Sequence, residues 1–319
     1  MGVKVKDIYY RSTLKAGAGI VGSFRYKDVF QIQSSKKTSS IFDGMYIDIE
    51  FNDRYRLNDG FEEKKNCLGQ GYGHLDLLKE LIALIQICSN HPCELYMKEN
   101  SIRPGPQELI PGFTQHSTLP YSPIIRKSDG RILNRMNSCQ DFFELQTQTE
   151  VFLDNYFNLD VKTRKRFNVS LFLLQNMRKI ILISVSMGIV GLISAIENLI
   201  DFEKKKKKVK IETCSLCSQP QYNVTSQFKK FMSKYSESNF VMNYNIKEYY
   251  HTEIEFKDEE SDKLISSFYK RRSKITHAGD ILEMDRTLST YSASEMRLFN
   301  EIETSVRIAL FSYLLDVNR

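Results

Sequence analysis

The sequence predicts an α+β protein in which a strand-rich mixed N-terminal domain precedes an all-helical up-and-down bundle. Three observations predict this class. Hydrophobic residues alternate with polar ones around residue 48, which is the period of a strand. From Val151 onward the hydrophobic spacing becomes helical. Five of the chain's seven prolines lie between these regions, in residues 101–129, so we expect domains at residues 1–147 and 148–319.

Short-range patterns predict the elements of the N-terminal domain. A half-buried strand is expected where hydrophobic and polar residues alternate, in the order Met45, Tyr46, Ile47, Asp48, Ile49, Glu50 and Phe51. Residues 24–33 form a weaker strand candidate. The hydrophobic face of residues 74–88 predicts a helix, after which residues 94–98 return as a strand.

The second domain is expected to consist of long helices with short links. Hydrophobic stripes predict helices at residues 167–177, 225–234 and 260–277, and a last helix that begins with a capping box of Ser292 and Glu295. The uncharged run Ile180–Ile196 contains two glycines and is shorter than the about 20 apolar residues of a membrane span. We therefore expect a helix buried in the bundle and no membrane partner, with a membrane-attached sensor as the weaker alternative.

Composition bounds the function classes. The 319 residues are 41% hydrophobic with a formal net charge of +6, which excludes a disordered chain and fits a polyanionic partner such as RNA without demanding one. Six cysteines in a chain of this length do not form a disulfide framework. The opening residues MGVKVKDIYY contain no apolar leader segment, so a cytoplasmic location is expected.

The segment Tyr269–Gly279, YKRRSKITHAG, combines two arginines, two lysines and a histidine at the end of a predicted helix that Gly279 caps. Histidine exchanges protons near neutral pH, and an arginine beside it can bind an oxyanion. These are the groups that cleavage of a phosphodiester at a ribose requires. The alternative is a solvated basic helix end with a capping histidine.

The same segment resembles the signature of HEPN domains, an arginine followed after four to six residues by a histidine close to a helix end. The match is closest to the ApeA-like branch, with Arg272 at the family's arginine and His277 at its histidine. LISAIENLI, at Leu192–Ile200, resembles the acidic-centred helix of the family and places Glu197 at its glutamate. The resemblance extends over roughly residues 151–319. Ser273 is a departure, because many active members have Asn, Asp or His after the arginine.

The resemblance implies metal-independent RNA cleavage, in which the ribose 2′-hydroxyl attacks the adjacent phosphate and catalysis needs no cofactor. His277 would move protons and Arg272 would bind the phosphate. Arg271, Ser273 and Lys274 would support them, although plain solvation is an equal alternative for the two cations. Five helical steps separate Arg272 from His277 by about 140°. A site shared between two copies relieves this offset, and HEPN nucleases are usually dimers, so we expect a homodimer through the helical domain.

Two further features lie in a predicted insertion near residues 203–222. CSLCSQPQYNVTSQFKKFMSKY resembles the Cys-pair insertion of the family, and the spacing of Cys214 and Cys217 suits a structural zinc. Two reduced cysteines are the alternative. A run of lysines precedes the pair and is expected to be a loop, either contacting RNA phosphates or forming a solvated tether, at Lys204, Lys205, Lys206, Lys207 and Lys208.

The resemblance to ApeA-like HEPN proteins therefore implies a toxin-like endoribonuclease of antiviral abortive-infection defence. The N-terminal domain would then be a sensor, target-binding or regulatory unit that responds to a viral or other trigger. The alternative is a catalytically silent HEPN bundle that serves as a dimerisation or nucleic-acid-binding module.

Overall fold

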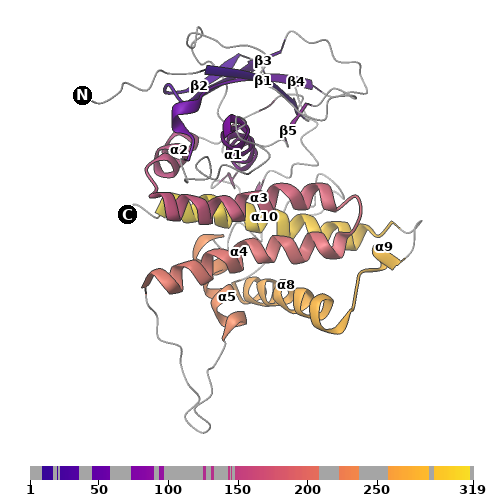
Figure 1. Cartoon of the computed structure of the whole chain (residues 1–319). Coiled ribbons are helices and arrows are strands. Elements are labelled where there is room, and N and C mark those ends of the chain that lie inside the picture. The colour runs from indigo at the N-terminus through magenta and orange to yellow at the C-terminus, as the bar shows by residue number, and fades with distance from the viewer. Residues whose placement is uncertain are drawn as a thin grey trace, which may run out of the picture. The chain divides into compact units, whose positions relative to one another are not determined.

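A computed structural model describes residues 9–16, 20, 22–35, 45–57, 73–89, 93–96, 125–126, 131–132, 143, 145, 148–207, 223–236, 258–286 and 291–316. An antiparallel sheet occupies the N-terminal part and the C-terminal part is mostly helical (Figure 1). The protein is therefore of the mixed α+β class. Its internal contacts divide it into two units, Met1–Ile124 with Leu133–Val161, and Ile125–Ile132 with Lys162–Arg319.

The first unit is built on a five-stranded antiparallel sheet with the order β2-β3-β4-β1-β5. Ile49, near the middle of β4, lies opposite Ser12 of β1 and Ile32 of β3. One short helical turn, η1 (Asp53–Tyr55), follows β4. The strands are β1 (Tyr9–Ala16), β2 (Ser23–Tyr26), β3 (Phe30–Ser34), β4 (Met45–Asn52) and β5 (Cys93–Leu95).

Two helices belong to this unit. Helix α1 (Gly73–Cys88) contacts β5 and buries its leucine and isoleucine side chains from Leu77 onward. Helix α2 (Thr149–Phe157) is tied to the unit by Tyr156, whose hydroxyl donates to Glu80 of α1 at 2.8 Å. Asp154 of α2 accepts a hydrogen bond from the Tyr26 hydroxyl at 2.6 Å. The contacts thus divide the chain after α2, whereas the sequence-based boundary precedes it.

The predicted strand at residues 45–51 is confirmed as β4, but the expectation that it is half-buried is wrong. Asp48 and Glu50, on its polar side, are only 6% and 4% exposed. They are buried because neighbouring strands supply partners, Arg11 and Thr13 for Asp48 and Gln31 for Glu50.

The other predictions for this unit are confirmed in part. The single strand expected at residues 24–33 is a hairpin of β2 and β3, whose turn holds Lys27 at a φ of 47°. The helix expected at residues 74–88 is α1. The strand expected at residues 94–98 is β5, at Cys93–Leu95, and residues 97–98 lie outside the described part of the chain.

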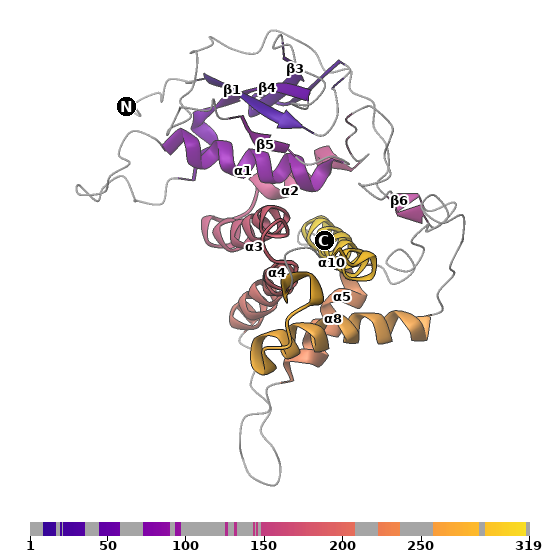
Figure 2. The ribbon, with the colours of Figure 1, turned by 90° about the vertical axis from the view of Figure 1, so that its right-hand side faces the viewer.

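Six helices and one short strand pair make up the described part of the second unit. Helix α10 contacts α4 and α5, and α8 contacts the same two helices from another side (Figure 2). Every residue of α10 from Ile302 to Phe311 is buried. The elements are β6 (Ile125–Arg126), β7 (Arg131–Ile132), α3 (Val161–Ile180), α4 (Val185–Lys207), α5 (Val224–Tyr235), α8 (Asp258–Ala278), α9 (Glu283–Arg286) and α10 (Ala293–Asp316).

The uncharged run Ile180–Ile196 was predicted to form one buried helix. This prediction is wrong for the first residues of the run. Helix α3 ends at Ile180 and α4 begins at Val185, while Leu182 and Ile183 in the turn between them are 88% and 85% exposed. Beyond the turn, the run packs closely. A Cβ atom on Gly191 would lie 2.0 Å from the Met177 sulfur of α3, so the Met177 side chain in its present position requires glycine here.

Helix α4 also bears on the membrane question. Among the described helices, its segment Val185–Lys206 is long and apolar enough to cross a membrane by length and composition alone. However, 56% of its most apolar window is buried inside the protein, as in the core helix of a soluble protein. The helix is therefore a weak argument for a membrane span.

The predicted capping box at the start of α10 is confirmed in one half. The Ser292 hydroxyl accepts a hydrogen bond from the backbone N–H of Glu295 at 3.3 Å. The Glu295 carboxylate does not return to Ser292; it accepts from the backbone N–H groups of Glu283 and Met284 at 2.9 and 3.0 Å. The first amides of α9 have no helical partner, and the carboxylate satisfies them.

Candidate active site

Helix α8 carries the predicted catalytic motif and ends as the sequence predicts. Its buried stripe includes Ile265, Phe268 and Ile275, which leaves the basic residues on the remaining surface. The helix stops at Ala278, and Gly279 follows with a φ of 66°. The backbone N–H of the next residue, Asp280, donates back to the Lys274 carbonyl at 3.2 Å. This left-handed glycine turns the chain back toward the last turns of α8.

Arg272 is held by a carboxylate from another helix. One oxygen of Glu197, in α4, accepts from the Arg272 guanidinium at 3.1 Å, and its other oxygen accepts from the Tyr269 hydroxyl at 3.0 Å. The guanidinium also lies over the Tyr269 ring, 5.8 Å from its centroid. Burial, and then the hydrogen bond to Glu197, raises the pKa of Tyr269, so this residue remains a neutral donor. We call Glu197, Tyr269 and Arg272 the Glu197 cluster.

The Glu197 cluster determines what Arg272 can do. Both charged side chains of the pair are about four-fifths buried, and a hydrogen bond to a charged group is stronger where water is scarce. Arg272 therefore has a fixed direction, which suits a group that orients an anion. Its charge is also balanced by Glu197, so binding of a phosphate there needs further cations nearby.

His277 lies in the last turn of α8 with its side chain exposed. Within the described residues, no hydrogen bond or ion pair of its ring is found, and none joins it to Arg272. The imidazole is therefore accessible for proton exchange with a ligand. The structure brings Arg272 and Glu197 together, but within one chain it leaves His277 apart from them.

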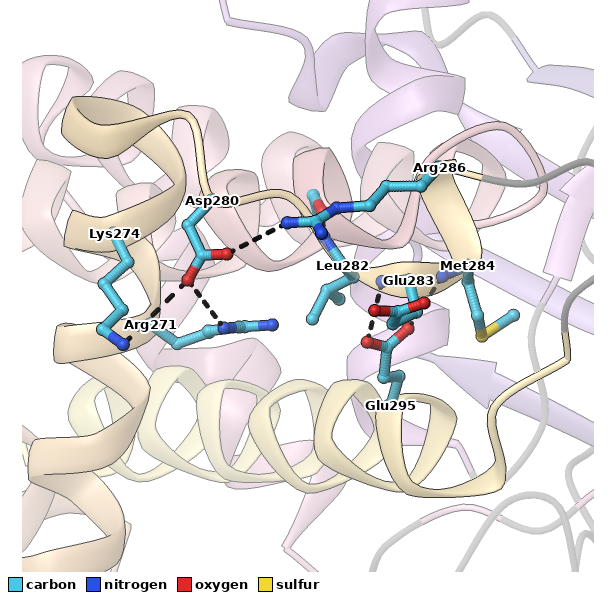
Figure 3. Close-up of polar contacts among 9 residues, drawn as sticks. Arg271, Lys274, Asp280, Leu282, Glu283, Met284, Arg286 and Glu295 are labelled. Atoms are coloured by element: carbon cyan, nitrogen blue, oxygen red, sulfur yellow. Dashed lines mark hydrogen bonds and ion pairs between the residues drawn. The ribbon is translucent and has the colours of Figure 1, made fainter.

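A second group of charges surrounds Asp280, as Figure 3 shows. One of its oxygens lies 3.3 Å from an Arg271 nitrogen and 4.0 Å from the Lys274 ammonium, and the other lies 3.2 Å from an Arg286 nitrogen. We call these four residues the Asp280 cluster. Sequence reasoning named Arg271 and Lys274 but missed Asp280 and Arg286. The signal available was an acidic residue directly after the glycine that caps a basic helix.

The segment that carries Asp280 and Arg286 is fixed at several points. The Asp285 carboxylate accepts from the backbone N–H groups of Val185 and Ser186, at 2.8 and 2.7 Å, at the start of α4. Burial alone would raise the pKa of Asp285, but hydrogen bonds from Ser186, Val185 and Ser184 hold it below its usual value. In return, the Ser186 hydroxyl accepts from the Leu282 N–H at 2.8 Å. These bonds fix α9 against α4.

The last predicted supporting residue, Ser273, lies on α8, and the predicted RNA-binding lysines lie at the end of α4 and beyond it. Ser273 is partly buried, and within the described residues its hydroxyl has no hydrogen-bond partner. The lysine run was predicted to be a loop, and this is wrong for Lys204–Lys207, because α4 continues through Lys207. Lysine is a good helix former, positive charges are favoured at a helix C-terminus, and Lys205 pairs with Asp201 one turn earlier at 2.7 Å. Lys208 lies outside the described residues.

The predicted zinc ligands Cys214 and Cys217 also lie outside the described residues. In the part of the chain that the structure describes, no group of three or more His, Cys, Asp or Glu side chains is arranged to hold a metal ion. The side chains of Cys88 and Cys93, in the first unit, are buried.

Comparisons with family models, with curated proteins and with solved structures gave no match to this chain. Any functional assignment therefore depends on the chemistry of α4, α8 and α9 and on the motif that α8 carries. The two charged clusters and the exposed histidine are the features that such an assignment must explain.

Proposed function

We propose that the protein is a metal-independent endoribonuclease of the HEPN type, with Arg272 binding the reacting phosphate and His277 transferring protons. One observation carries the proposal. Glu197 and Tyr269 hold Arg272 in a fixed direction, while His277, one and a half turns later on the same helix, is exposed and without a described partner. An oriented cation and an accessible imidazole are the two groups that this chemistry needs.

In the proposed reaction the ribose 2′-hydroxyl attacks the adjacent phosphorus and its proton passes to His277. The bond from phosphorus to the 5′-oxygen breaks, and that oxygen takes up a proton. One product ends in a 2′,3′-cyclic phosphate and the other begins with a 5′-hydroxyl. Arg272 stabilises the negative charge that grows on the phosphate oxygens. Every group required belongs to the protein or the RNA, so no metal ion takes part.

We further propose that the site is shared by two copies of the chain, with Arg272 from one copy and His277 from the other. This explains why a single chain leaves the two side chains apart on a helix where they are offset by about 140°. The shared site makes the protein a homodimer through its helical unit. The surface lysines at the end of α4 would contact the RNA backbone outside the site.

The wider role remains a proposal from the resemblance alone. The protein would act in the cytoplasm as a toxin in antiviral abortive infection, with the first unit sensing a viral or other trigger. A structural zinc held by Cys214 and Cys217 belongs to the same proposal.

The test compares the full chain with His277→Ala and Arg272→Ala. Loss of the imidazole should lower the rate of RNA cleavage by about 10²- to 10⁴-fold, and loss of the guanidinium by about 10²-fold or more. The matched control is Thr276→Ala, because Thr276 is an exposed neighbour of His277 whose hydroxyl, among the described residues, bonds to carbonyls of its own helix. Wild-type cleavage should persist in EDTA. If His277→Ala cleaves RNA at the wild-type rate, the proposal that His277 catalyses RNA cleavage is contradicted.

A second function is a catalytically silent HEPN module that dimerises or binds nucleic acid. The observation in its favour is that no described contact joins Arg272 and His277 within one chain. This function predicts that the wild-type protein binds RNA but leaves it intact under every condition in which the dimer forms.

A further inference from the structure

The Asp280 cluster places three cations around one carboxylate at the end of the helix that carries His277 (Figure 3). Its local charge is positive, because one acidic side chain faces two arginines and a lysine. We propose that Arg271, Lys274 and Arg286 form a binding site for a backbone phosphate of RNA, and that Asp280 occupies this site until the phosphate displaces it. That the ligand is RNA rests on the proposed function; the anion site rests on the cluster itself.

The cations converge because two different segments present them. Arg271 and Lys274 are three residues apart on α8, so they lie next to each other on the helix surface. Arg286 comes from α9, whose place is fixed by Asp285 at the start of α4 and by Glu295 at its own first amides. Figure 3 shows the Arg286 side chain extending back from α9 toward Asp280. The site is therefore preorganised and does not depend on one mobile side chain.

The cations have donors to spare for a phosphate. Asp280 engages one terminal nitrogen of Arg271 and one of Arg286. The Nε–H of Arg271 is buried and has no hydrogen-bond partner within the described residues. A phosphodiester offers two charged oxygens, as a carboxylate does, and a guanidinium can bind such a pair of oxygens side by side. The phosphate can thus replace Asp280 by giving one oxygen to each arginine, as the carboxylate does, or by binding one guanidinium with both oxygens.

Displacement is favoured by exposure. The side chains of Asp280, Lys274 and Arg286 are 37%, 52% and 48% exposed, and only Arg271 among these four residues is more buried, at 26%. Ion pairs this open to water are weak, so exchanging one anion for another costs little. The Asp280 carboxylate then competes with every anion that enters the site. An RNA phosphate can overcome this competition, because neighbouring nucleotides of the same RNA strand make further contacts with the protein. Since Lys274 lies one turn before His277, the bound phosphate neighbours the one that is cleaved.

The test measures binding of a labelled single-stranded RNA to the full chain carrying His277→Ala, so that no RNA is cut. Asp280→Asn, made in that background, should tighten binding about threefold to tenfold at low salt, because the competing charge is gone. Arg286→Ala should weaken binding and lower the slope of log affinity against log salt by about 1, as expected for one lost phosphate contact. When Arg286→Ala is already present, adding Asp280→Asn should tighten RNA binding less than it does when Arg286 is intact. Lys270→Ala is the matched control, since Lys270 is exposed on α8 and lies outside the cluster.

Unchanged or weaker binding by Asp280→Asn, with the salt slope of Arg286→Ala equal to that of the control, would overturn the proposal. Circular dichroism and thermal unfolding check that each variant is folded. If Asp280→Asn does not fold, the salt slope of Arg286→Ala decides between the two outcomes. This readout is independent of cleavage. If the wild-type chain binds RNA through the cluster but never cuts it, the ribonuclease proposal fails and the anion site stands.

Discussion

The Glu197 cluster and the Asp280 cluster both join arginines of α8 to a carboxylate, yet they differ in burial. The side chains of Arg272 and Glu197 are 21% and 20% exposed, and a tyrosine hydroxyl takes the second oxygen of Glu197. In the Asp280 cluster Arg271 is similarly buried at 26% exposure, but Asp280 is 37% exposed and Lys274 and Arg286 are about half exposed. Where water is largely excluded, an ion pair holds its partners in place; where water has access, the partners exchange. The same chemical pair can therefore serve as a support in one place and as a ligand site in another.

The largest effect should follow from breaking the Glu197 cluster. Glu197→Ala leaves Arg272 without its partner in a partly buried place and should lower the free energy of unfolding by about 1–3 kcal/mol. RNA cleavage should also fall by about tenfold or more, because Arg272 loses its fixed direction. Chemical denaturation and cleavage assays measure the two quantities. The control is Asp201→Asn, an exposed acid on the same helix, and an equal loss in that variant would show that Glu197 has no special role.

A smaller effect is expected at Asp285, which supports the segment that carries the Asp280 cluster. Asp285→Asn should lower the free energy of unfolding by about 1–2 kcal/mol at neutral pH, since a charged N-cap of α4 is lost. The folded pKa of Asp285 lies below its ordinary value of 3.8, so its contribution is complete above that value and is lost as the pH falls through the folded pKa. The difference between wild type and variant, measured by denaturation at several pH values, should therefore shrink as the pH falls from about 4 toward 2. A difference that grows on acidification would contradict this account.

The smallest effect should come from the Asp280 cluster itself. Asp280→Asn should change the free energy of unfolding by less than about 0.5 kcal/mol, because exposed ion pairs contribute little. Thermal unfolding of Asp280→Asn and of Glu197→Ala under the same conditions measures the difference in stability loss between the two clusters. A loss as large as that of Glu197→Ala would mean that Asp280 is a structural support and that the distinction between the clusters is false.

The part of the site that could be predicted from the sequence rests on neighbouring residues. Gly279 indicated the end of α8 correctly because a helix stop depends on the conformation of one residue. The contacts of Tyr269 and Arg286 could not be predicted in this way. Tyr269 reaches a carboxylate 72 residues earlier, and Arg286 turns back to Asp280 because Asp285 is fixed by α4, 99 and 100 residues away along the chain. Such contacts depend on how the helices pack against one another, so short-range sequence patterns do not predict them.

The errors at the level of the fold have the same origin. In the run Ile180–Ile196 the turn at residues 181–184 is marked by Ser184, whose hydroxyl accepts from the Met187 N–H at the start of α4, but the hydrophobicity on both sides extended one predicted helix across it. The lysines after Asp201 were assigned to a loop by their charge, although their helix propensity and the pairing of Lys205 with Asp201 keep them helical. Likewise, the burial of Asp48 and Glu50 depends on Arg11 and Gln31 in other strands.

The claim that Arg272 and His277 act together in a site shared by two chains can be tested by mixing variants. Arg272→Ala and His277→Ala chains, each inactive alone, are combined in equal amounts under conditions that allow subunits to exchange. Half of the dimers are then mixed, and each mixed dimer contains one intact site of two, so about a quarter of the wild-type cleavage rate should return. If light scattering and a tagged pull-down show that mixed dimers have formed and RNA is still not cut, the shared-site account is contradicted.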